Sequence, residues 1–173
     1  MDDDVIRGAR VRLRPITRED RDAVVAMRRT PEVHRRWRGD DVAAEVDADL
    51  ADPARHLVVT TDDGRVVGLV QDGEEEDTDY RSASVDLFVD PAMHRRGYGS
   101  DAVRTLCDHL FDERGHHRVT IDPAVDDEAA IACYARVGFR PVGVLRAYER
   151  QSDGTWADGL LMELLATDRP GPG

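Results

Sequence analysis

The chain has 173 residues, 35% of them charged, and a formal net charge of −12 at pH 7. This length suits one domain with a substantial core. The excess of acidic residues argues against nucleic acid as a partner, and it fits either a cationic partner or a charge that only keeps the protein in solution. The lack of a long apolar run and of a signal-peptide pattern predicts a cytoplasmic protein that does not bind membranes.

The first half of the chain alternates between strand and helix patterns. Val11-Arg12-Leu13-Arg14 alternates apolar and charged side chains as a half-buried strand does, and Thr17 or Asp20 can cap the helix that follows. Residues 31–37 are expected to break that helix, and Asp62-Asp63-Gly64 has the composition of a hairpin turn. The predicted elements are a strand at 10–15, helices at 20–29 and 42–50, and strands at 56–61 and 65–71.

The second half predicts a charge-rich loop, then strands alternating with helices, then a closing hairpin. The predicted elements are the loop at 73–80, strands at 82–89 and 119–121, helices at 98–111 and 128–137, and strands at 140–150 and 156–165. Residues 5–168 are therefore expected to form the domain. The Pro- and Gly-rich residues 169–173 are expected to form a disordered tail.

Both cysteines of the chain, Cys107 and Cys133, fall in predicted helices among apolar residues. This placement favours reduced, partly buried thiols over a disulfide. We also expect no bound metal.

A Gly-rich turn follows the apolar strand that ends at Val89. It reads His94-Arg95-Arg96-Gly97-Tyr98-Gly99-Ser100 and opens the helix predicted at 98–111. Such a turn can hold a phosphate, because glycine lets the backbone approach, the N–H groups at a helix start attract anions, and arginine supplies shaped donors. The spacing differs from the P-loop, and the third glycine of the dinucleotide fingerprint is absent.

Two motifs in this order resemble the GCN5-related N-acetyltransferases (the GNAT superfamily). The first is His94-x-x-Gly97-x-Gly99, in which His94 departs from the usual Arg or Gln. The second is Ala130-Ile131-x-x-Tyr134-x-x-x-Gly138-Phe139, and the resemblance covers roughly residues 10–165. It implies an α/β fold with a single-domain, mixed, mostly antiparallel central sheet flanked by helices on both faces.

The resemblance also implies acetyl-CoA as the co-substrate. Its pyrophosphate would lie on the turn, and the backbone of the preceding strand would bind the acetyl carbonyl and the pantetheine arm. A backbone N–H there is the natural oxyanion donor. The implied cofactor-binding residues are Leu87, Phe88, Val89, His94, Arg95, Arg96, Gly97, Tyr98, Gly99, Ser100, Asp127, Ala130 and Tyr134.

Tyr134 resembles the tyrosine that lies near the CoA sulfur in this family, where its phenol can protonate the departing thiolate. A narrower likeness joins Val85-Asp86-Leu87 and Asp122-Pro123 to the aminoglycoside 6′-N-acetyltransferases. It implies that Asp86 and Asp122 bind the substrate amine and that Asp122 accepts its proton. An ordinary turn aspartate and a satisfied core tyrosine remain the simpler readings of these residues.

Further substrate contacts follow from the same likeness. The segment Trp37-Arg38-Gly39-Asp40-Asp41 resembles the Trp-Gly-Gly-acidic segment of that group, which implies that Trp37 forms a wall of the sugar site. A core or hinge tryptophan is the alternative. Glu75 lies in the acidic loop and Asp158 in the closing strand, and both are expected to contact the substrate. Asp127 stands where the aminoglycoside group has Asn, which removes the amide donors and could weaken CoA binding.

The leading hypothesis is therefore an acetyltransferase that acts on the 6′-amino group of an aminoglycoside or a similar cationic amine. A protein N-terminal (ribosomal-protein-type) acetyltransferase and a polyamine acetyltransferase share the same CoA half and remain alternatives. A non-catalytic CoA-binding module is the third hypothesis. We expect the protein to be a monomer or a homodimer.

Overall fold

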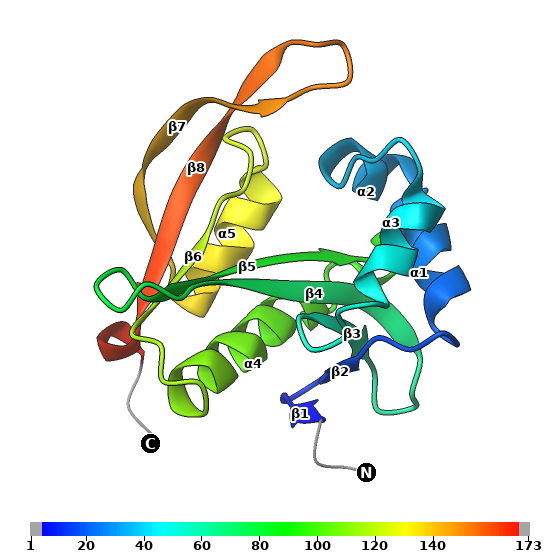
Figure 1. Cartoon of the computed structure of the whole chain (residues 1–173), viewed down its shortest axis with the longest axis horizontal. Helices are drawn as coiled ribbons and strands as arrows, with labels where there is room; N and C mark the ends of the chain where they lie inside the picture. Colours follow the sequence, from blue (N-terminus) through cyan, green and yellow to red (C-terminus); the bar gives the residue numbers. More distant parts are fainter. Residues whose placement is uncertain (1–4, 170–173) are drawn as a thin grey trace. The chain divides into compact units, whose positions relative to one another are not determined.

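A computed structural model of the chain describes residues 5–169 (Figure 1). Its strands are β1 (Ile6–Arg7), β2 (Arg12–Pro15), β3 (His56–Thr60), β4 (Val66–Glu75), β5 (Ser82–Val89), β6 (Arg118–Ile121), β7 (Arg140–Arg150) and β8 (Trp156–Leu165). Its α-helices are α1 (Arg21–Arg28), α2 (Pro31–Arg36), α3 (Val42–Asp49), α4 (Tyr98–Asp112) and α5 (Glu128–Val137), with 3-10 turns at Pro91–Met93 and Ala166–Asp168.

The eight strands form one sheet in the order β1-β2-β3-β4-β5-β6-β8-β7. β5 and β6 pair in parallel, with Ala83 opposite Val119, whereas β1–β2, β2–β3, β3–β4, β6–β8 and β7–β8 pair antiparallel. The α/β class and the mixed, mostly antiparallel sheet are thus confirmed.

The structure corrects the predicted elements in three places. β1 was not predicted. Residues 31–37 do end α1, but they also form α2, because Pro31 at the first helical position fixes a helical φ without removing a needed donor. β4 runs on to Glu75 through the start of the expected loop. Two of its carboxylates are neutralised there, since Asp72 pairs with Arg55 at 3.3 Å and Glu74 pairs with Arg114.

Two compact units make up the described chain. The first holds residues 5–73 and 86–106. In it, apolar residues of α1, α2 and α3 pack on one face of the sheet, against Val58, Leu69 and Phe88. Leu57, Val58, Val59 and Thr60 of β3 are all buried, so both faces of that strand are covered. Figure 1 shows the three helices gathered together (blue to cyan).

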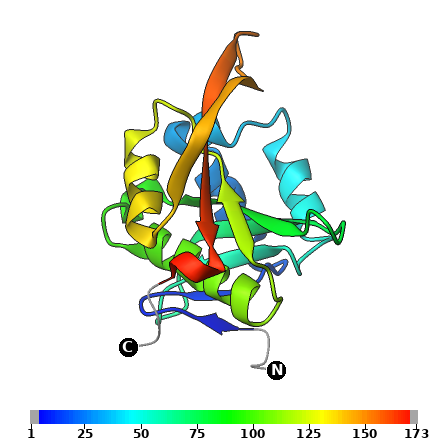
Figure 2. The ribbon, with the colours of Figure 1, turned by 90° about the vertical axis from the view of Figure 1, so that its left-hand side faces the viewer.

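The second unit holds residues 74–85 and 107–169. Its largest feature is the hairpin of β7 and β8, which lie side by side in Figures 1 and 2. The inner positions of β8, Met162 and Leu164, are buried, as are Tyr134 and Val137 of α5. Gly138 ends α5 at a φ of 120°, a conformation that favours glycine.

Arg169, expected to be the first residue of the disordered tail, is instead held by the end of α4. Its guanidinium pairs with Asp108 at 3.0 Å and with Asp112 at 2.6 Å, and it lies 5.0 Å from the ring centroid of Phe111. Residues 170–173, the rest of the expected tail, lie outside the described residues.

Neither Cys107 nor Cys133 forms a disulfide, as predicted. Cys107 is buried, and burial raises the pKa of its thiol well above its usual range, so it is held as the neutral thiol.

Candidate active site

The Gly-rich turn before α4 has the backbone shape of an anion cradle. Arg95 adopts a φ of 62° and Gly97 a φ of 81°, both in the left-handed region. Alternation of such residues with ordinary ones turns successive N–H groups toward one side. α4 then begins at Tyr98, and the first N–H groups of a helix have no acceptor within the helix itself. Arg95 and Arg96 are exposed beside them. This donor set fits the pyrophosphate of CoA.

Asp101, in the first turn of α4, fixes the turn to the chain that precedes β2. Its buried carboxylate accepts hydrogen bonds from the backbone N–H groups of Ala9, Arg10 and Val11, at 3.3, 2.7 and 3.1 Å. These donors balance its charge close to the cradle. The side chain of Arg10 also borders the turn, because a Cβ built on Gly97 would lie 3.6 Å from its Cδ and Nε atoms. Sequence reasoning did not identify Arg10 as part of the cradle.

His94 and Ser100 brace the same turn. The Nε2–H of His94 donates to the carbonyl of Val89 at 2.9 Å, which ties the turn to the end of β5. The hydroxyl of Ser100 donates to the carbonyl of Gly97 at 3.2 Å. His94, which stands where the family usually has Arg or Gln, therefore holds the turn in place through this hydrogen bond.

The β5 segment from Asp86 to Val89 differs from expectation in one respect. Asp86 lies inside the strand predicted at 82–89 as apolar, where a buried charge would be costly, but its side chain is exposed, so its charge carries no burial penalty. The backbone N–H of Leu87 donates to the Asp86 carboxylate at 2.8 Å. Phe88 is buried in the core of the first unit. β4 comes close to this segment at Gly68, where a Cβ would lie 2.3 Å from the Phe88 carbonyl oxygen.

Trp37 lies on the core rather than free in solvent. Its ring meets that of Phe88 edge-on, and the guanidinium of Arg28 lies 5.7 Å from its centroid. Arg28 is buried and pairs with Glu45 at 2.6 Å. The alternative of a packed tryptophan is therefore observed, and its role as a substrate wall stays a prediction.

In the second unit, Asp122 follows the end of β6 and is exposed. The hydroxyl of Tyr148 donates a hydrogen bond to its carboxylate. The chain after Asp122 runs along β8, because the N–H of Leu160 donates to the Pro123 carbonyl at 2.8 Å and the N–H of Val125 donates to the Asp158 carbonyl at 3.2 Å. The structure thus brings Asp122 and Asp158 onto adjacent segments.

Asp158 has a contact that the sequence did not indicate. Its side chain accepts a hydrogen bond from the backbone N–H of Ala147 at 2.7 Å. Its expected contact with substrate remains a prediction.

The remaining predicted residues of the second unit belong to α5, its N-cap and the end of β4: Asp127, Ala130, Tyr134 and Glu75. The Asp127 carboxylate caps α5 by accepting from the N–H of Ala130 at 3.1 Å. Glu75 is exposed at the end of β4 and accepts from the N–H of Asp77 at 3.0 Å. Tyr134 is 7% exposed, and its ring centroid lies 6.3 Å from that of Phe139.

The structure therefore assembles the candidates in two groups. In the first unit these are Trp37, Asp86, Leu87, Phe88, Val89, His94, Arg95, Arg96, Gly97, Tyr98, Gly99 and Ser100. In the second unit they are Glu75, Asp122, Asp127, Ala130, Tyr134 and Asp158. Tyr148 was missed, because one exposed tyrosine in a strand carries no sequence signal that distinguishes it.

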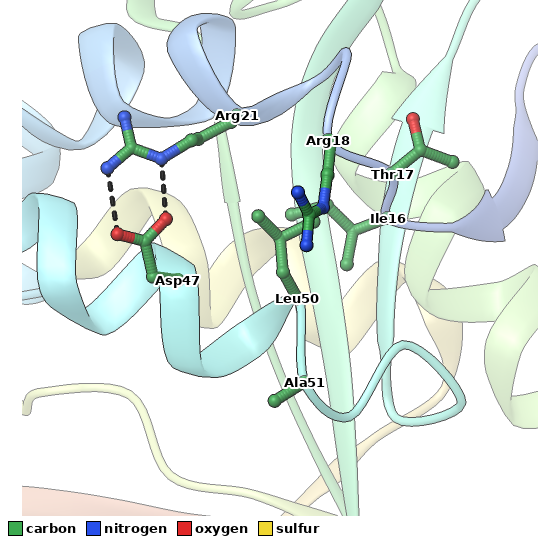
Figure 3. Close-up of a pocket in the computed structure, with 7 residues that line it drawn as sticks. All are labelled: Ile16, Thr17, Arg18, Arg21, Asp47, Leu50 and Ala51. Atoms are coloured by element: carbon green, nitrogen blue, oxygen red, sulfur yellow. Dashed lines mark hydrogen bonds and ion pairs between the residues drawn. The ribbon is translucent and has the colours of Figure 1, made fainter.

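A separate surface depression of about 640 Å³ lies between the loop before α1 and the end of α3 (Figure 3). It is lined by Ile16, Thr17, Arg18, Arg21, Asp47, Leu50 and Ala51. Arg21 and Asp47 close a bidentate ion pair at 2.5 and 2.8 Å, so their charges are paired with each other. None of these residues is among the predicted site residues.

Within residues 5–169, no group of three or more His, Cys, Asp or Glu side chains is arranged to hold a metal ion. In the same part of the chain, no helix combines the length and the apolar character needed to cross a membrane.

Residues 10–140 match the family model for the acetyltransferase (GNAT) domain. The chain belongs to the GNAT acetyltransferase family. The expected superfamily, whose members are acetyl-CoA-dependent N-acetyltransferases, is thus confirmed.

Relatives of known name support this membership. The chain is 35% identical over 152 residues to a mycothiol acetyltransferase of Clavibacter sepedonicus, a match that covers 82% of this chain and 47% of that protein. It is 34% identical over 119 residues to the N-alpha-acetyltransferase RimI of Mycobacterium tuberculosis, covering 66% of this chain and 72% of that one. The chain therefore spans about half the length of the mycothiol acetyltransferase.

A solved structure gives the same picture of the fold. RimJ of Mycobacterium smegmatis, in complex with CoA-disulfide, superposes with a TM-score of 0.76 at 25% identity, covering 96% of this chain and 86% of that one. Binding of CoA is typical of the GNAT family, to which this chain belongs.

The narrower likeness to aminoglycoside acetyltransferases is partial. An aminoglycoside N(6′)-acetyltransferase of Klebsiella pneumoniae is 30% identical over 94 residues, which cover 54% of this chain and 42% of that protein. By their names these relatives act on different acceptors, and acetyl transfer is what they share.

Proposed function

We propose that this protein transfers the acetyl group of acetyl-CoA to a primary amine of a cationic small molecule, with aminoglycosides as the first class to test. The proposal of a cationic acceptor rests on the exposure of Asp86 and Asp122. Each of them stands at the position that the resemblance assigns to amine binding. The net charge of −12 supports it, because a negative field attracts cations over a longer range.

The residues of this chain have distinct tasks in the proposed reaction. When bound, acetyl-CoA supplies the thioester that the amine attacks. The turn from Arg95 to Ser100 holds its pyrophosphate through backbone N–H groups and arginines. A backbone N–H of the Leu87–Val89 segment stabilises the negative charge that develops on the acetyl oxygen.

Three proton transfers balance the reaction. An ammonium has no lone pair, so it must lose a proton before it attacks the carbonyl carbon, and the Asp122 carboxylate accepts that proton. The C–N bond forms and the C–S bond breaks, the Tyr134 hydroxyl donates its proton to the departing sulfur, and the new amide nitrogen releases its second proton to solvent. Transfer of a proton from solvent restores Tyr134, and release of one to solvent restores Asp122.

A second candidate is acetylation of a protein N-terminus. It is favoured by the relatives named N-alpha-acetyltransferase and by the structural match to RimJ. It uses the same CoA half and the same proton transfers, and it differs in the acceptor alone.

The test is a thiol-release assay with acetyl-CoA and three acceptor sets: aminoglycosides, spermidine, and peptides with a free N-terminal alanine or serine. Asp86→Asn and Asp122→Asn are compared with Asp22→Asn, an equal charge change on the exposed first turn of α1. We expect the two site variants to lose activity toward the cationic small molecules, and the Asp22 variant to keep it. Activity confined to the peptides would overturn the small-molecule proposal in favour of the second candidate.

A further inference from the structure

Tyr148 is a surface residue with an unusual contact. Its side chain is 50% exposed, on the outer strand β7, yet its hydroxyl donates to the carboxylate of Asp122. The contact joins residues 26 positions apart. Asp122 is the group to which the proposed function assigns the amine and its proton.

The backbone of β7 is deformed where Tyr148 lies. Leu145 pairs with Gly159 and Glu149 pairs with Ala157, so three residues of β7 face the single residue Asp158 of β8. Within this bulge Ala147 adopts a φ of 48°, which is unfavourable for a residue with a Cβ. Bulges of this kind re-aim a side chain.

Two residues of β8 hold the bulge in place. The Asp158 carboxylate accepts from the N–H of Ala147 at 2.7 Å, which satisfies a donor that the ladder leaves out. Gly159 leaves room for the tyrosine ring, because a Cβ at this position would lie 2.9 Å from Cδ1 of Tyr148. The strained residue, its cap and the glycine all direct Tyr148 toward Asp122.

We propose that Tyr148 is a positioning residue, which holds the carboxylate of Asp122 in the orientation that accepts the amine proton. This inference rests on the proposed function, because it gives Tyr148 a role only through Asp122. An exposed aspartate beyond a strand end has several rotamers, and a hydrogen bond from a phenol selects one of them. A proton acceptor must be placed to within a fraction of an ångström, so the loss of this hydrogen bond should lower turnover.

A wall of the acceptor site is the competing role for Tyr148, since its ring is exposed. The two roles differ in kinetics. A residue that only binds the acceptor affects KM, whereas one that orients the proton acceptor affects kcat. They differ also in coupling, because only the positioning role requires Asp122 to be present.

The experiment is a double-mutant cycle with Tyr148→Phe, Asp122→Asn and the combined variant, measured by thiol release with the best acceptor. Tyr148→Phe removes the hydroxyl and keeps the ring on Gly159. Tyr80→Phe, at a tyrosine that is 74% exposed in the loop before β5, is the matched control. Thermal unfolding of each variant checks that the fold is kept.

We expect Tyr148→Phe to lower kcat about 10- to 100-fold with a nearly unchanged KM, and to have less than about a twofold effect once Asp122 is Asn. Asp158→Ala, which removes the cap of the bulge, should reproduce the loss of kcat and is a second route to the same result. The control should behave as the parent protein does.

Different failures have different meanings. If Asp122→Asn retains full turnover, the proposed function loses its proton acceptor. If Asp122→Asn is impaired while Tyr148→Phe turns over normally or faster, the positioning role alone is overturned. An effect on KM only, or an effect of equal size in both backgrounds, also overturns it and assigns Tyr148 to the acceptor wall.

Discussion

The ring of Trp37 meets the ring of Phe88 edge-on, with centroids 5.0 Å apart and planes at 78°. Phe88 belongs to β5, the strand whose backbone is proposed to bind the acetyl group. The guanidinium of Arg28 lies over the same indole. Arg28 is buried and forms an ion pair with Glu45. Trp37 therefore links the segment after α2 to the proposed acetyl site through packing.

Trp37→Ala should test this link. We expect the free energy of unfolding to fall by about 2 kcal/mol, because an aromatic pair and a cation–π contact are lost from a partly buried site. KM for the amine should rise as well if the segment also forms the acceptor wall. Urea unfolding and steady-state kinetics measure the two effects. Trp37→Phe, which keeps a ring, is the control, and unchanged stability in Trp37→Ala would contradict the packing argument.

Gly97→Val should weaken binding of CoA about 10- to 100-fold, because loss of a charge-assisted hydrogen bond is worth roughly 1.5–3 kcal/mol. A β-branched residue at a φ of 81° also strains the backbone. Gly64→Val is the matched control, since Gly64 has a φ of 83° in the β3–β4 turn and a Cβ there would meet no atom within 4 Å. Calorimetry with CoA decides, and equal affinities in both variants would place the pyrophosphate elsewhere.

Tyr134→Phe should lower kcat by about 10²- to 10⁴-fold, the usual worth of general acid catalysis. Tyr134 is buried and packs near Phe139, so the substitution removes a hydroxyl with little change of volume. Affinity for acetyl-CoA, measured by calorimetry, should be nearly unchanged. Normal turnover in this variant would mean that Tyr134 only packs.

Asp20→Asn should make the free energy of unfolding less dependent on pH in the acidic range. Burial raises the pKa of Asp20, but hydrogen bonds from Arg14 and Thr17 outweigh burial and hold its pKa below the usual value. Both terminal guanidinium nitrogens of Arg14 donate to its carboxylate oxygens, at 2.7 and 2.8 Å. We expect a loss of about 2 kcal/mol in the free energy of unfolding at neutral pH, because one partner of a partly buried ion pair is removed.

The direction of the pH effect follows from the lowered pKa. The carboxylate contributes its full stability above its unfolded pKa, near about pH 4, and loses it as the pH falls through the lower folded value. The difference between the parent and Asp20→Asn should therefore shrink with acidification below about pH 4. Urea unfolding across this range measures it, and a difference that stays constant would contradict the argument.

Most element boundaries of the second half were predictable because they are local. The strands β5, β7 and β8 and the helix α5 have the predicted bounds, since apolar periodicity, Gly138 and the turn before Trp156 mark them in the sequence. The continuation of β4 through an acidic stretch was not predictable. It depends on Arg55 and Arg114, which lie far along the chain from the carboxylates they neutralise.

The sequence by itself determined the family, because the Gly97-x-Gly99 turn and the Ala130 to Phe139 motif are short and contiguous. It also determined the conformation of that turn, since Gly97 tolerates the left-handed φ that the cradle needs. Only the tertiary structure decided that Asp86 is exposed, that Trp37 packs on Phe88, and that Asp158 caps a bulge. The contact of Tyr148 with Asp122 was likewise decided by the tertiary structure alone, because it depends on strand register and on a bulge. Both arise from pairing between distant segments and leave no periodic pattern in the sequence.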